Sequence, residues 1–374
     1  MELESTLAQA YAGKRVLVTG HTGFKGGWMS AWLDAMGAET FGYALAPPTE
    51  PSLFDLAGIA SLVDHRIGDI RDGQAVHDRI AEVRPDIIFH MAAQPLVRDS
   101  YRTPVETIAT NVMGTAHVLD AVRRLGRACA VVIVTSDKCY DNKEWVWGYR
   151  ETDPMGGHDP YSMSKGAAEL VTDSFRKSFF ADPDSAVRVA SARAGNVIGG
   201  GDWATDRIMT DCIASLVAGE PIRLRNPLAT RPWQHVLEPV GGYLWLGRHL
   251  MQPDGQRFAE GWNFGPAADS VCPVRDLADL VIRAWGSGSW ELAGDPAQVK
   301  EALSLSLNCD KAHHLLGWRP SWSIEHCVTE TAAWYKAWHT GNADLLELMR
   351  GQIAAYRDAA AAQKVRWALP AQAA

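Results

Sequence analysis

The sequence predicts an α/β protein with a doubly wound parallel sheet and a smaller, mostly helical C-terminal lobe. Short apolar runs rich in β-branched residues alternate with helix-like stretches through residues 15–192, as is typical of a parallel sheet with helices on both faces. A glycine-rich loop follows the first run, and the fifth run ends abruptly in polar side chains. The chain has 374 residues, too many for one ordinary core, so we expect two lobes.

Composition and charge argue against several classes of protein. The net charge of −8 is unlike a nucleic-acid surface, which usually carries a basic patch. No stretch reaches the roughly 18 continuous apolar residues of a membrane span, and the acidic start of the chain is unlike an export signal. The six cysteines are scattered without a C-x-x-C pair, which favours free thiols over disulfides or a zinc site. We therefore expect a cytoplasmic protein that holds no metal and binds neither nucleic acid nor membrane.

A loop with the spacing G-x-x-G-x-x-G follows the first predicted strand, Arg15–Thr19, and precedes a predicted helix, Trp28–Met36. Its glycines let the backbone turn tightly and approach a pyrophosphate, which the amino end of the helix then attracts. The loop's histidine and lysine can add positive contacts to phosphate. Strand, glycine loop and helix in this order predict a Rossmann-like dinucleotide site. The loop residues expected to contact the cofactor are Gly20, His21, Gly23, Phe24, Lys25 and Gly26.

The second and third strands leave the choice between NAD and NADP open. An NAD site usually carries an acid near the end of the second strand, about twenty residues past the glycines. That strand is expected at Thr40–Leu45, and residues 43–48 include neither an acid nor an arginine that could bind a 2′-phosphate. The third strand, Val63–Gly68, is followed by Asp69 and Ile70, and this carboxylate could reach an adenine amine.

The fourth strand, Asp86–Met91, ends beside residues that suit a bound cofactor. Ala92 and Ala93 are small enough to let the chain pass close to it, and Gln94 follows them. We interpret His90, at the end of this strand, as a histidine whose hydrogen bonds are satisfied rather than as a ligand or an acid.

The fifth strand carries the candidate chemistry. Its apolar run, residues 131–134, stops at Thr135, Ser136, Asp137 and Lys138, which supply hydroxyls, an acid and a base. A central parallel strand delivers such groups to the carboxyl edge of the sheet, where folds of this kind bind ligands.

Two long helices are expected, Thr103–Leu125 and Tyr161–Phe179, and Pro160 stands before the second. Tyr161 and Lys165 are four residues apart, so both side chains lie on one helix face. A nearby ammonium favours the tyrosinate and lowers the tyrosine pKa, which makes Tyr161 a candidate base for a sugar or alcohol hydroxyl. A Y-x-x-x-K pattern alone is weak, and its value here comes from the polar strand end that precedes it.

The segment Tyr140–Pro160 is expected to be a long loop at the carboxyl edge, where long loops tend to be functional. Its aromatic residues could cover a sugar or a base, or could pack the loop on itself, and both interpretations stay open. The aromatic residues concerned are Trp145, Trp147 and Tyr149.

The chain is expected to leave the sheet after the sixth strand, Ala186–Ala192, at a glycine cluster in residues 195–203. Arg223, Arg225 and Arg231 follow, and the guanidinium fork matches a phosphate bidentately. For the first two, the alternative of surface arginines in loops stays open. The further elements expected are helices at 206–219 and 237–250, a strand at 262–265, and helical segments from Val274 onward with a stop at 315–320.

With these motifs in view, the chain resembles the extended short-chain dehydrogenases/reductases over nearly its whole length. Within them it resembles the nucleotide-sugar 4,6-dehydratases, whose catalytic trio follows a strand as Thr-Asp-Glu. The lysine at the third position departs from the dTDP-glucose and GDP-mannose branches. It is similar to the CDP-glucose 4,6-dehydratases, which share segments 20–26, 135–140 and 195–203. The motif positions that carry the resemblance are Gly20, Gly23, Gly26, Asp69, Ile70, Asn111, Ser136, Tyr161, Lys165 and Asn196.

The resemblance implies a bound NAD that is regenerated in each turnover, CDP-glucose as substrate, and a homodimer packed through the helices near 104–125 and 161–179. It implies a dinucleotide-binding domain of residues 1–192 and about 234–262, and a nucleotide-sugar-binding lobe of about 193–233 and 263–374. The catalytic residues implied are Ser136, Asp137, Lys138, Tyr161 and Lys165. Beyond the loop residues, the cofactor site implied includes Asp69, Ile70, Ala92, Ala93, Asn111, Thr135, Tyr161 and Lys165. The substrate-binding residues implied are Gln94, Ser136, Asn196, Trp203, Arg231 and His235.

The implied reaction divides the catalytic residues between two steps. Tyr161, helped by Ser136, takes the C4 hydroxyl proton while a hydride goes to the nicotinamide. A base then removes the acidic C5 proton, an acid protonates the departing C6 hydroxyl, and the hydride returns to C6. By analogy Lys138 is the base and Asp137 the acid, which requires a lowered pKa for the lysine and a raised pKa for the aspartic acid.

Several alternatives stay open. The first explains Lys138 simply as an ion-pair partner of Asp137. A 4-epimerase or another nucleotide-sugar dehydratase of the same fold would also need Tyr161 and Lys165, whereas a non-catalytic dinucleotide sensor often lacks that pair. The sequence does not tell which residues read cytosine or which deoxysugar pathway the product enters.

Overall fold

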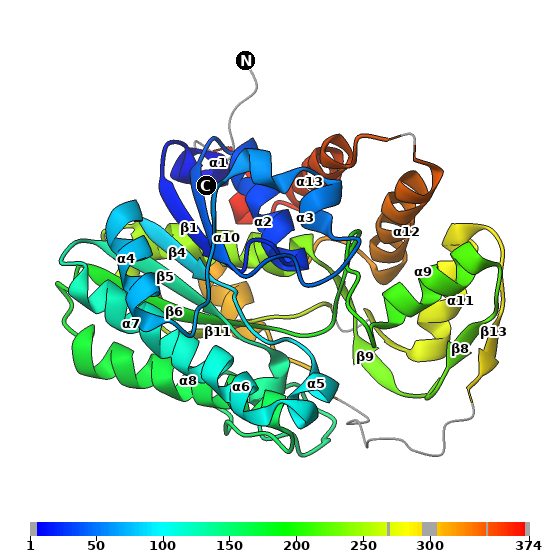
Figure 1. Cartoon of the computed structure of the whole chain (residues 1–374), viewed down its shortest axis with the longest axis horizontal. Coiled ribbons are helices and arrows are strands. Elements are labelled where there is room, and N and C mark those ends of the chain that lie inside the picture. Colours follow the sequence, from blue (N-terminus) through cyan, green and yellow to red (C-terminus); the bar gives the residue numbers. More distant parts are fainter. Residues whose placement is uncertain (1–5, 268–269, 294–304, 342, 371–374) are drawn as a thin grey trace.

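The computed structural model describes residues 6–267, 270–293, 305–341 and 343–370, and its centre is one parallel sheet of seven strands (Figure 1). The strand order is β11-β6-β5-β4-β1-β2-β3, so the chain reverses direction across the sheet between β1 and β4. This order confirms the predicted doubly wound sheet and places a ligand site outside the carboxyl ends of β1 and β4. The strands are β1 (Arg15–Thr19), β2 (Glu39–Ala44), β3 (Asp64–Ile67), β4 (Ile87–His90), β5 (Cys129–Val134), β6 (Val187–Ala194) and β11 (Gly261–Phe264).

Helices cover both faces of the sheet (Figure 1). Val16 and Val18 of β1 point into the core on one face, whereas Leu17 points into the core on the other. Because side chains of a strand alternate between faces, burial on both sides requires the nearly continuous apolar runs seen in the sequence. On one face lie α4 (Gly73–Val83), α7 (Gly114–Arg124) and α8 (Pro160–Phe179), and on the other α2 (Phe24–Ala35) and α10 (Leu237–Met251).

Two helices differ from the expected boundaries near the site. Helix α2 begins at Phe24, inside the glycine loop, rather than at Trp28. The expected helix over 103–125 is interrupted by a π-helical turn between α6 (Pro104–Ile108) and α7. That turn contains Asn111, whose side chain accepts a hydrogen bond from the backbone N–H of Gln94 at 2.8 Å and donates one to its carbonyl at 3.1 Å. The interruption therefore aims an amide at the loop after β4, as π-turns often do at functional sites.

The second lobe is mostly helical, as predicted, but it also contains short strand pairs that the sequence did not reveal. These strands have two or three residues each, too few for a periodic pattern. The exact lobe boundaries stay a prediction, and α13 (Leu345–Ala362) packs against α2 of the first lobe. The helices of this region are α9 (Ile208–Ala218), α11 (Val274–Trp285) and α12 (Ile324–Thr340). The short strands are β7 (Val197–Ile198), β8 (Ile222–Leu224), β9 (Thr230–Pro232), β10 (Gln234–His235), β12 (Val271–Pro273) and β13 (Trp290–Leu292).

Three shorter helices complete the described fold: α1 (Thr6–Tyr11), α3 (Leu53–Leu56) and α5 (Val97–Arg102). Within the described ranges, no helix has the length and apolar character needed to cross a membrane. Over the same ranges, no cluster of three histidine, cysteine or carboxylate side chains is arranged to hold a metal ion.

Candidate active site

The glycine loop has no room for side chains at two of its glycines. Gly20 adopts a φ of +80°, and a Cβ there would lie 2.7 Å from the backbone nitrogen of Ala92. A Cβ on Gly26 would lie 2.1 Å from the carbonyl oxygen of Gly20. Gly23 is the N-cap of α2, and no side chain in the described part of the chain caps that helix end. The first N–H groups of α2 are therefore available to a phosphate, as a dinucleotide site requires.

His21 is buried and neutral, so the positive charge expected at this loop position is absent, while its contact with the cofactor stays a prediction. Its side chain is fully buried, its ring lies against Gly42, and its Nε2 is 3.3 Å from Nδ1 of His65. Burial and the neighbouring His65 lower the pKa of His21 to about 4, so the ring is neutral at physiological pH. His21 is therefore a packing residue in this structure, and the sequence of the loop alone does not reveal its burial.

Lys25, from the same loop, lies in the field of the polar cluster at the end of β5. Burial lowers the pKa of Lys25 to about 8, and the positive charges of Arg207 and Lys165 act in the same direction. Asp137 and Asp202 act against this lowering. The lysine thus stands between the glycine loop and the candidate catalytic residues, close enough to interact electrostatically with both Lys165 and Asp137.

The residues that follow β3 and β4 line the same edge of the sheet but make different contacts. Asp69 is paired with Arg71, whose Nη2 lies 2.6 Å from Oδ2, and this hydrogen-bonded pair lowers the Asp69 pKa. Ile70 is buried against Gly114. Ala92 closes on Gly20, and Ala93 continues that loop. An adenine would therefore meet an aspartate that already has a guanidinium partner.

Several of the side chains predicted to contact ligands form hydrogen bonds with other groups of the protein. The side chain of Gln94 forms hydrogen bonds with both backbone groups of Leu96, at 2.8 Å and 3.0 Å, so it closes a turn rather than reaching out to a sugar. Asn111 also donates to Ser164 of α8 at 2.8 Å, which makes it a brace between that helix and the Gln94 loop. The hydroxyl of Thr135 donates to Glu169, away from the cofactor edge.

The end of β5 brings Ser136, Asp137 and Tyr161 together. Ser136 donates from Oγ to Oδ1 of Asp137 at 2.9 Å, while Oδ2 is buried and has no partner among the described residues. Burial raises the pKa of Asp137, although the nearby charge of Lys138 opposes the rise. A raised pKa is what the role of acid requires, so the direction expected for Asp137 is confirmed.

For Tyr161 the expected direction of the pKa shift is wrong in this structure. Burial raises the pKa of Tyr161 to about 12, while a hydrogen bond with Ser136 and the charge of Arg207 oppose the rise. Lys165 is itself buried, and its pKa falls to about 8 because of that burial. Desolvation of the phenol thus exceeds the help from neighbouring charges, a balance that sequence spacing cannot show.

Lys138 follows directly in a short 3₁₀ turn, Asp137–Cys139, and is only partly buried. Its ammonium makes no hydrogen bond or ion pair with any residue of the described ranges, so the structure does not contain the simple ion pair with Asp137. Its backbone N–H donates to Oγ of Ser136 at 3.2 Å.

A second buried cluster, which the sequence did not reveal, lies one helical turn beyond Lys165. Glu169 accepts hydrogen bonds from Arg193 at 2.8 Å, from Ser191 at 2.6 Å and from Thr135. Burial raises the pKa of Glu169, but the Arg193 guanidinium and these hydrogen bonds outweigh it and hold the pKa below its usual value. Glu169 continues the four-residue spacing from Tyr161 and Lys165, and this periodicity is the signal that could have found it.

Among the second-lobe residues, Trp203 and His235 pack against aromatic rings of other segments. The ring of Trp203 lies 4.5 Å from that of Trp338, measured between centroids. His235 is fully buried between Trp28 and Trp322, and burial lowers its pKa to about 3. Residues of α12 lie against Trp203, whereas α2 and the segment before α12 enclose His235, and the roles of both as substrate contacts stay predictions.

Arg231 and Asn196 stay candidates for substrate. Arg231 lies on β9 and is partly exposed, and its Nη1 donates to the carbonyl of Thr230 at 2.8 Å. The carbonyl of Asn196 accepts from the N–H of Gln234 at 3.1 Å, which leaves its amide side chain outside the backbone pairing. Arg223 is paired with Glu291 at 3.3 Å on an exposed strand, which favours the surface interpretation for that arginine.

The structure also bears on His90 and on the aromatic residues of the long loop. His90 bonds Thr19 at 2.8 Å and Thr115 at 3.3 Å, so it is a satisfied histidine as interpreted. In the long loop, Tyr149 stacks on Tyr140 and Trp145 with centroid distances of 5.2 Å and 5.1 Å, so these residues pack the loop on itself, whereas Trp147 is exposed and its role stays open.

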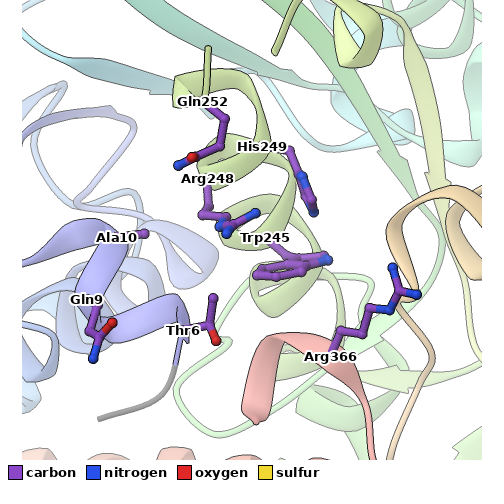
Figure 2. Close-up of a pocket in the computed structure, with 8 residues that line it drawn as sticks. All are labelled: Thr6, Gln9, Ala10, Trp245, Arg248, His249, Gln252 and Arg366. Atoms are coloured by element: carbon purple, nitrogen blue, oxygen red, sulfur yellow. The ribbon is translucent and has the colours of Figure 1, made fainter. Parts of the chain in front are cut away.

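A cavity of about 400 Å³ lies away from this chemistry, between α1 and the last turns of α10 (Figure 2). Trp245, Arg248, His249 and Arg366 are among the residues that line it. Helix α1 precedes the amino end of β1, whereas the candidate residues follow the carboxyl ends of β1, β4 and β5. The cavity is therefore separate from the candidate active site.

The parallel sheet, the glycine loop and the Tyr161–Lys165 pair together define an extended short-chain dehydrogenase/reductase. The family model described as GDP-mannose 4,6 dehydratase matches residues 17–331, and the chain belongs to that family. A CDP-glucose 4,6-dehydratase from Salmonella typhimurium is 51% identical over 353 residues, which is 93% of this chain and 98% of the relative. A dTDP-glucose 4,6-dehydratase from Streptomyces antibioticus is 30% identical over 72% of this chain and 75% of its own.

Solved structures agree on the fold. A dTDP-glucose 4,6-dehydratase from Streptomyces venezuelae, with NAD bound, aligns with a TM-score of 0.73 at 23% identity and covers 88% of this chain and 99% of its own. A UDP-glucose 4-epimerase from Thermotoga maritima aligns equally well, with a TM-score of 0.73 at 20% identity, covering 86% of this chain and 98% of its own. Dehydratases and epimerases share this architecture, so only the site can separate them.

Proposed function

We propose that this protein converts CDP-glucose to CDP-4-keto-6-deoxyglucose, a 4,6-dehydratase reaction that uses NAD. The observation that carries the proposal is the 51% identity to a CDP-glucose 4,6-dehydratase across 93% of the chain. The polar strand end supports it, because Asp137, an acid with a raised pKa, stands near Tyr161 and is followed by Lys138, whose ammonium has no partner among the described residues. An epimerase needs the tyrosine and lysine but no acid and base after the strand.

The cofactor fits the glycine loop and the amino end of α2. At Gly20 and Gly26 a Cβ would clash with neighbouring backbone, so glycine is needed for the tight turn that leads into the amino end of α2, where a pyrophosphate would bind. Lys165 and the Ala92–Ala93 segment border the same edge. NAD, when bound, accepts a hydride from C4 and returns it to C6.

In the first step Tyr161 removes the proton of the C4 hydroxyl. Its pKa of about 12 must fall for this task, and two groups of the site already work in that direction. One is the hydrogen bond with Ser136, and the other is the positive charge of Arg207.

In the second step Asp137 donates a proton to the departing C6 hydroxyl, and Lys138 removes the C5 proton. Burial keeps the carboxyl of Asp137 protonated to higher pH than usual, and its Oδ2 has no competing partner among the described residues. Lys138 follows Asp137 in the chain and is partly exposed. Its ammonium makes no hydrogen bond or ion pair within the described ranges.

Assembly and location are further parts of the proposal. We expect a homodimer through the region from α5 to α7 and α8, because these neighbouring helices expose large apolar side chains. The exposed apolar residues are Tyr101, Val105, Ile108, Met113, Met163, Leu170 and Phe179. A cytoplasmic location is supported by the cysteines, all of which are free thiols. Sedimentation of the purified protein would give the oligomeric state directly.

The direct test is incubation of the NAD-loaded protein with CDP-glucose, dTDP-glucose, UDP-glucose and GDP-mannose. We expect a keto product, seen by its absorbance in alkali, with CDP-glucose preferred. Equal turnover of dTDP-glucose would contradict the substrate assignment. A C4 epimer without any keto product would contradict the reaction assignment and favour the epimerase.

A further inference from the structure

Two arginines from different parts of the chain meet on one carboxylate oxygen. Nη1 of Arg98 lies 3.3 Å from Oδ1 of Asp206, and Nη2 of Arg225 lies 3.3 Å from the same oxygen. Arg98 belongs to α5 of the sheet domain, whereas Asp206 and Arg225 flank α9 of the second lobe. The pairing therefore joins the two lobes through a carboxylate that carries one charge against two guanidinium groups.

The ion pairs of Asp206 with Arg98 and Arg225 are exposed and weak. The side chains of Arg98, Asp206 and Arg225 are 36%, 39% and 32% exposed, and ion pairs with such exposure contribute about 0–1 kcal/mol. Asp211 adds a second negative charge within electrostatic reach of both arginines. An anion with more charge and more oxygens could replace the carboxylate at little cost, since the guanidinium fork matches phosphate geometry bidentately.

The position of Arg98 ties it to the candidate active site. Helix α5 follows the loop of Ala92, Ala93 and Gln94, and Ser100 of that helix accepts a hydrogen bond from the backbone N–H of Tyr161 at 3.1 Å. On the other side, Arg207 is the neighbour of Asp206 and its charge reaches Tyr161. The arginine pair therefore stands beside the site where the sugar must present C4 to Tyr161.

We propose that Arg98 binds the pyrophosphate of the nucleotide-sugar, and that Asp206 occupies Arg98 and Arg225 until the pyrophosphate displaces it. The inference rests on the proposed function, because that function supplies a substrate with a diphosphate between its sugar and its nucleoside. It assigns to the sheet domain a phosphate ligand that complements the second-lobe Arg231. It also makes Asp206 a competitor of the substrate rather than a contact for it.

Opposite effects of two substitutions test this inference. We expect Arg98→Gln to raise KM for CDP-glucose roughly ten- to hundredfold with kcat little changed, as for the loss of a charged hydrogen bond made equally in ground and transition state. Direct titration should show the same loss of affinity for CDP, while the affinity for NAD stays unchanged. Arg98→Lys should recover part of the loss, because it restores the charge without the fork.

Asp206→Asn should do the reverse and tighten CDP binding several-fold, because it removes the competing charge. In the double variant Arg98→Gln/Asp206→Asn most of that gain should disappear, since the arginine that the aspartate blocked is gone. The matched control is Arg102→Gln on the same helix, whose arginine is 75% exposed and paired with Asp99. It should leave KM and CDP affinity unchanged.

The outcomes separate this inference from the proposed function. An unchanged CDP affinity in Arg98→Gln, or a weakened one in Asp206→Asn, would overturn the inference and leave only a structural link between the lobes. Failure of the wild-type protein to form a keto product from CDP-glucose would overturn the proposed function instead. The CDP titration needs no turnover, so the two results are independent.

Discussion

Helix α8 carries two buried polar clusters about one turn apart. The first joins Tyr161 to the strand-end residues Ser136 and Asp137, with Lys165 one turn further along the helix, and the second surrounds Glu169. Both clusters take their strand partners from the end of β5, where Thr135 and Ser136 are neighbours in the chain but point to different sides. In the second cluster each carboxylate oxygen of Glu169 accepts hydrogen bonds. In the first, one oxygen of Asp137 has no partner among the described residues.

The difference shows that burial by itself does not create a reactive group. Burial opposes the charged form of both carboxyl groups, but Arg193 and two hydroxyls outweigh it at Glu169, whose pKa is lowered. At Asp137 nothing outweighs it, and the pKa is raised. A buried group that is left incompletely satisfied keeps the capacity to exchange a proton, whereas the satisfied pair fixes the position of α8 against the sheet. We therefore assign chemistry to the first cluster and support to the second.

The largest effect is expected from Tyr161→Phe. This change removes the proposed base and leaves the glycine loop intact, so turnover should be abolished while NAD remains bound. General acid–base groups contribute about 10²–10⁴-fold, so any remaining rate should lie at least that far below wild type. Single-turnover assays with quantification of bound NAD would measure both. A variant that keeps most of the wild-type rate would refute the assignment of the first cluster.

Lys138→Ala should separate the two steps of the reaction. Oxidation at C4 uses Tyr161 and should persist, so reduced cofactor should appear transiently by its absorbance. Removal of the C5 proton should fail, and overall turnover should fall by about 10²–10⁴-fold. A single turnover in deuterated water would then return sugar without deuterium at C5. Wild-type exchange at C5 would exclude Lys138 as the base.

Asp137→Asn is the matched variant, because it keeps the base and removes the acid. We expect some exchange at C5 but little loss of water from C6. The same change should stabilise the fold near neutral pH. The folded pKa of Asp137 is raised, so ionisation costs stability as pH rises above its unfolded value, and asparagine cannot ionise. Urea unfolding at neutral pH and at pH 4 would show whether the gain is confined to the higher pH.

Glu169→Gln should act on stability in the opposite direction. Its side chain and that of Arg193 are 4% and 5% exposed, and breaking such a buried pair costs about 3–5 kcal/mol in free energy of unfolding. The folded pKa of Glu169 is lowered, so its contribution is present above its unfolded pKa and is lost as pH falls through the folded value. The control is Glu39→Gln, whose pair with Arg15 is exposed and should contribute about 0–1 kcal/mol. Equal losses of unfolding free energy in the two variants would show that the buried Glu169–Arg193 pair contributes no more than an exposed ion pair.

The features that sequence predicted well depend on neighbours in the chain. The strands, the glycine loop and the Tyr161–Lys165 pair are periodic or closely spaced patterns, and the structure contains the sheet in the order that such a pattern favours. The opposite sides taken by Thr135 and Ser136 could also have been predicted, because successive side chains of a strand alternate.

The features that sequence missed depend on what packs against a residue from elsewhere. His21 and His235 carry the right chemistry for a ligand site, but distant segments bury them. The ion pair between Glu169 and Arg193 and the contact between Arg98 and Asp206 join residues far apart in the chain. The sign of the Tyr161 pKa shift depends on a balance between burial and several charges, which no spacing encodes.

The smallest effect, and the sharpest test of the boundary between the clusters, comes from their two neighbouring strand-end hydroxyls. Ser136 lowers the pKa of Tyr161 through a hydrogen bond, so Ser136→Ala should raise that pKa further and reduce the tyrosinate present at neutral pH. One hydrogen bond contributes about 0.5–1.5 kcal/mol, which corresponds to roughly a tenfold lower kcat/KM at most. The variant should reach any given rate at a higher pH than wild type.

Thr135→Ala removes the adjacent hydroxyl, which belongs to the Glu169 cluster. It should lower the free energy of unfolding modestly. The profile of kcat/KM against pH should not change, because Thr135 forms its hydrogen bond with Glu169 rather than with Tyr161. Profiles of kcat/KM against pH for wild type and both variants would make the comparison. If both alanine variants moved the profile equally, the two clusters would act as one unit. The single-residue boundary between chemistry and support would then have to be abandoned.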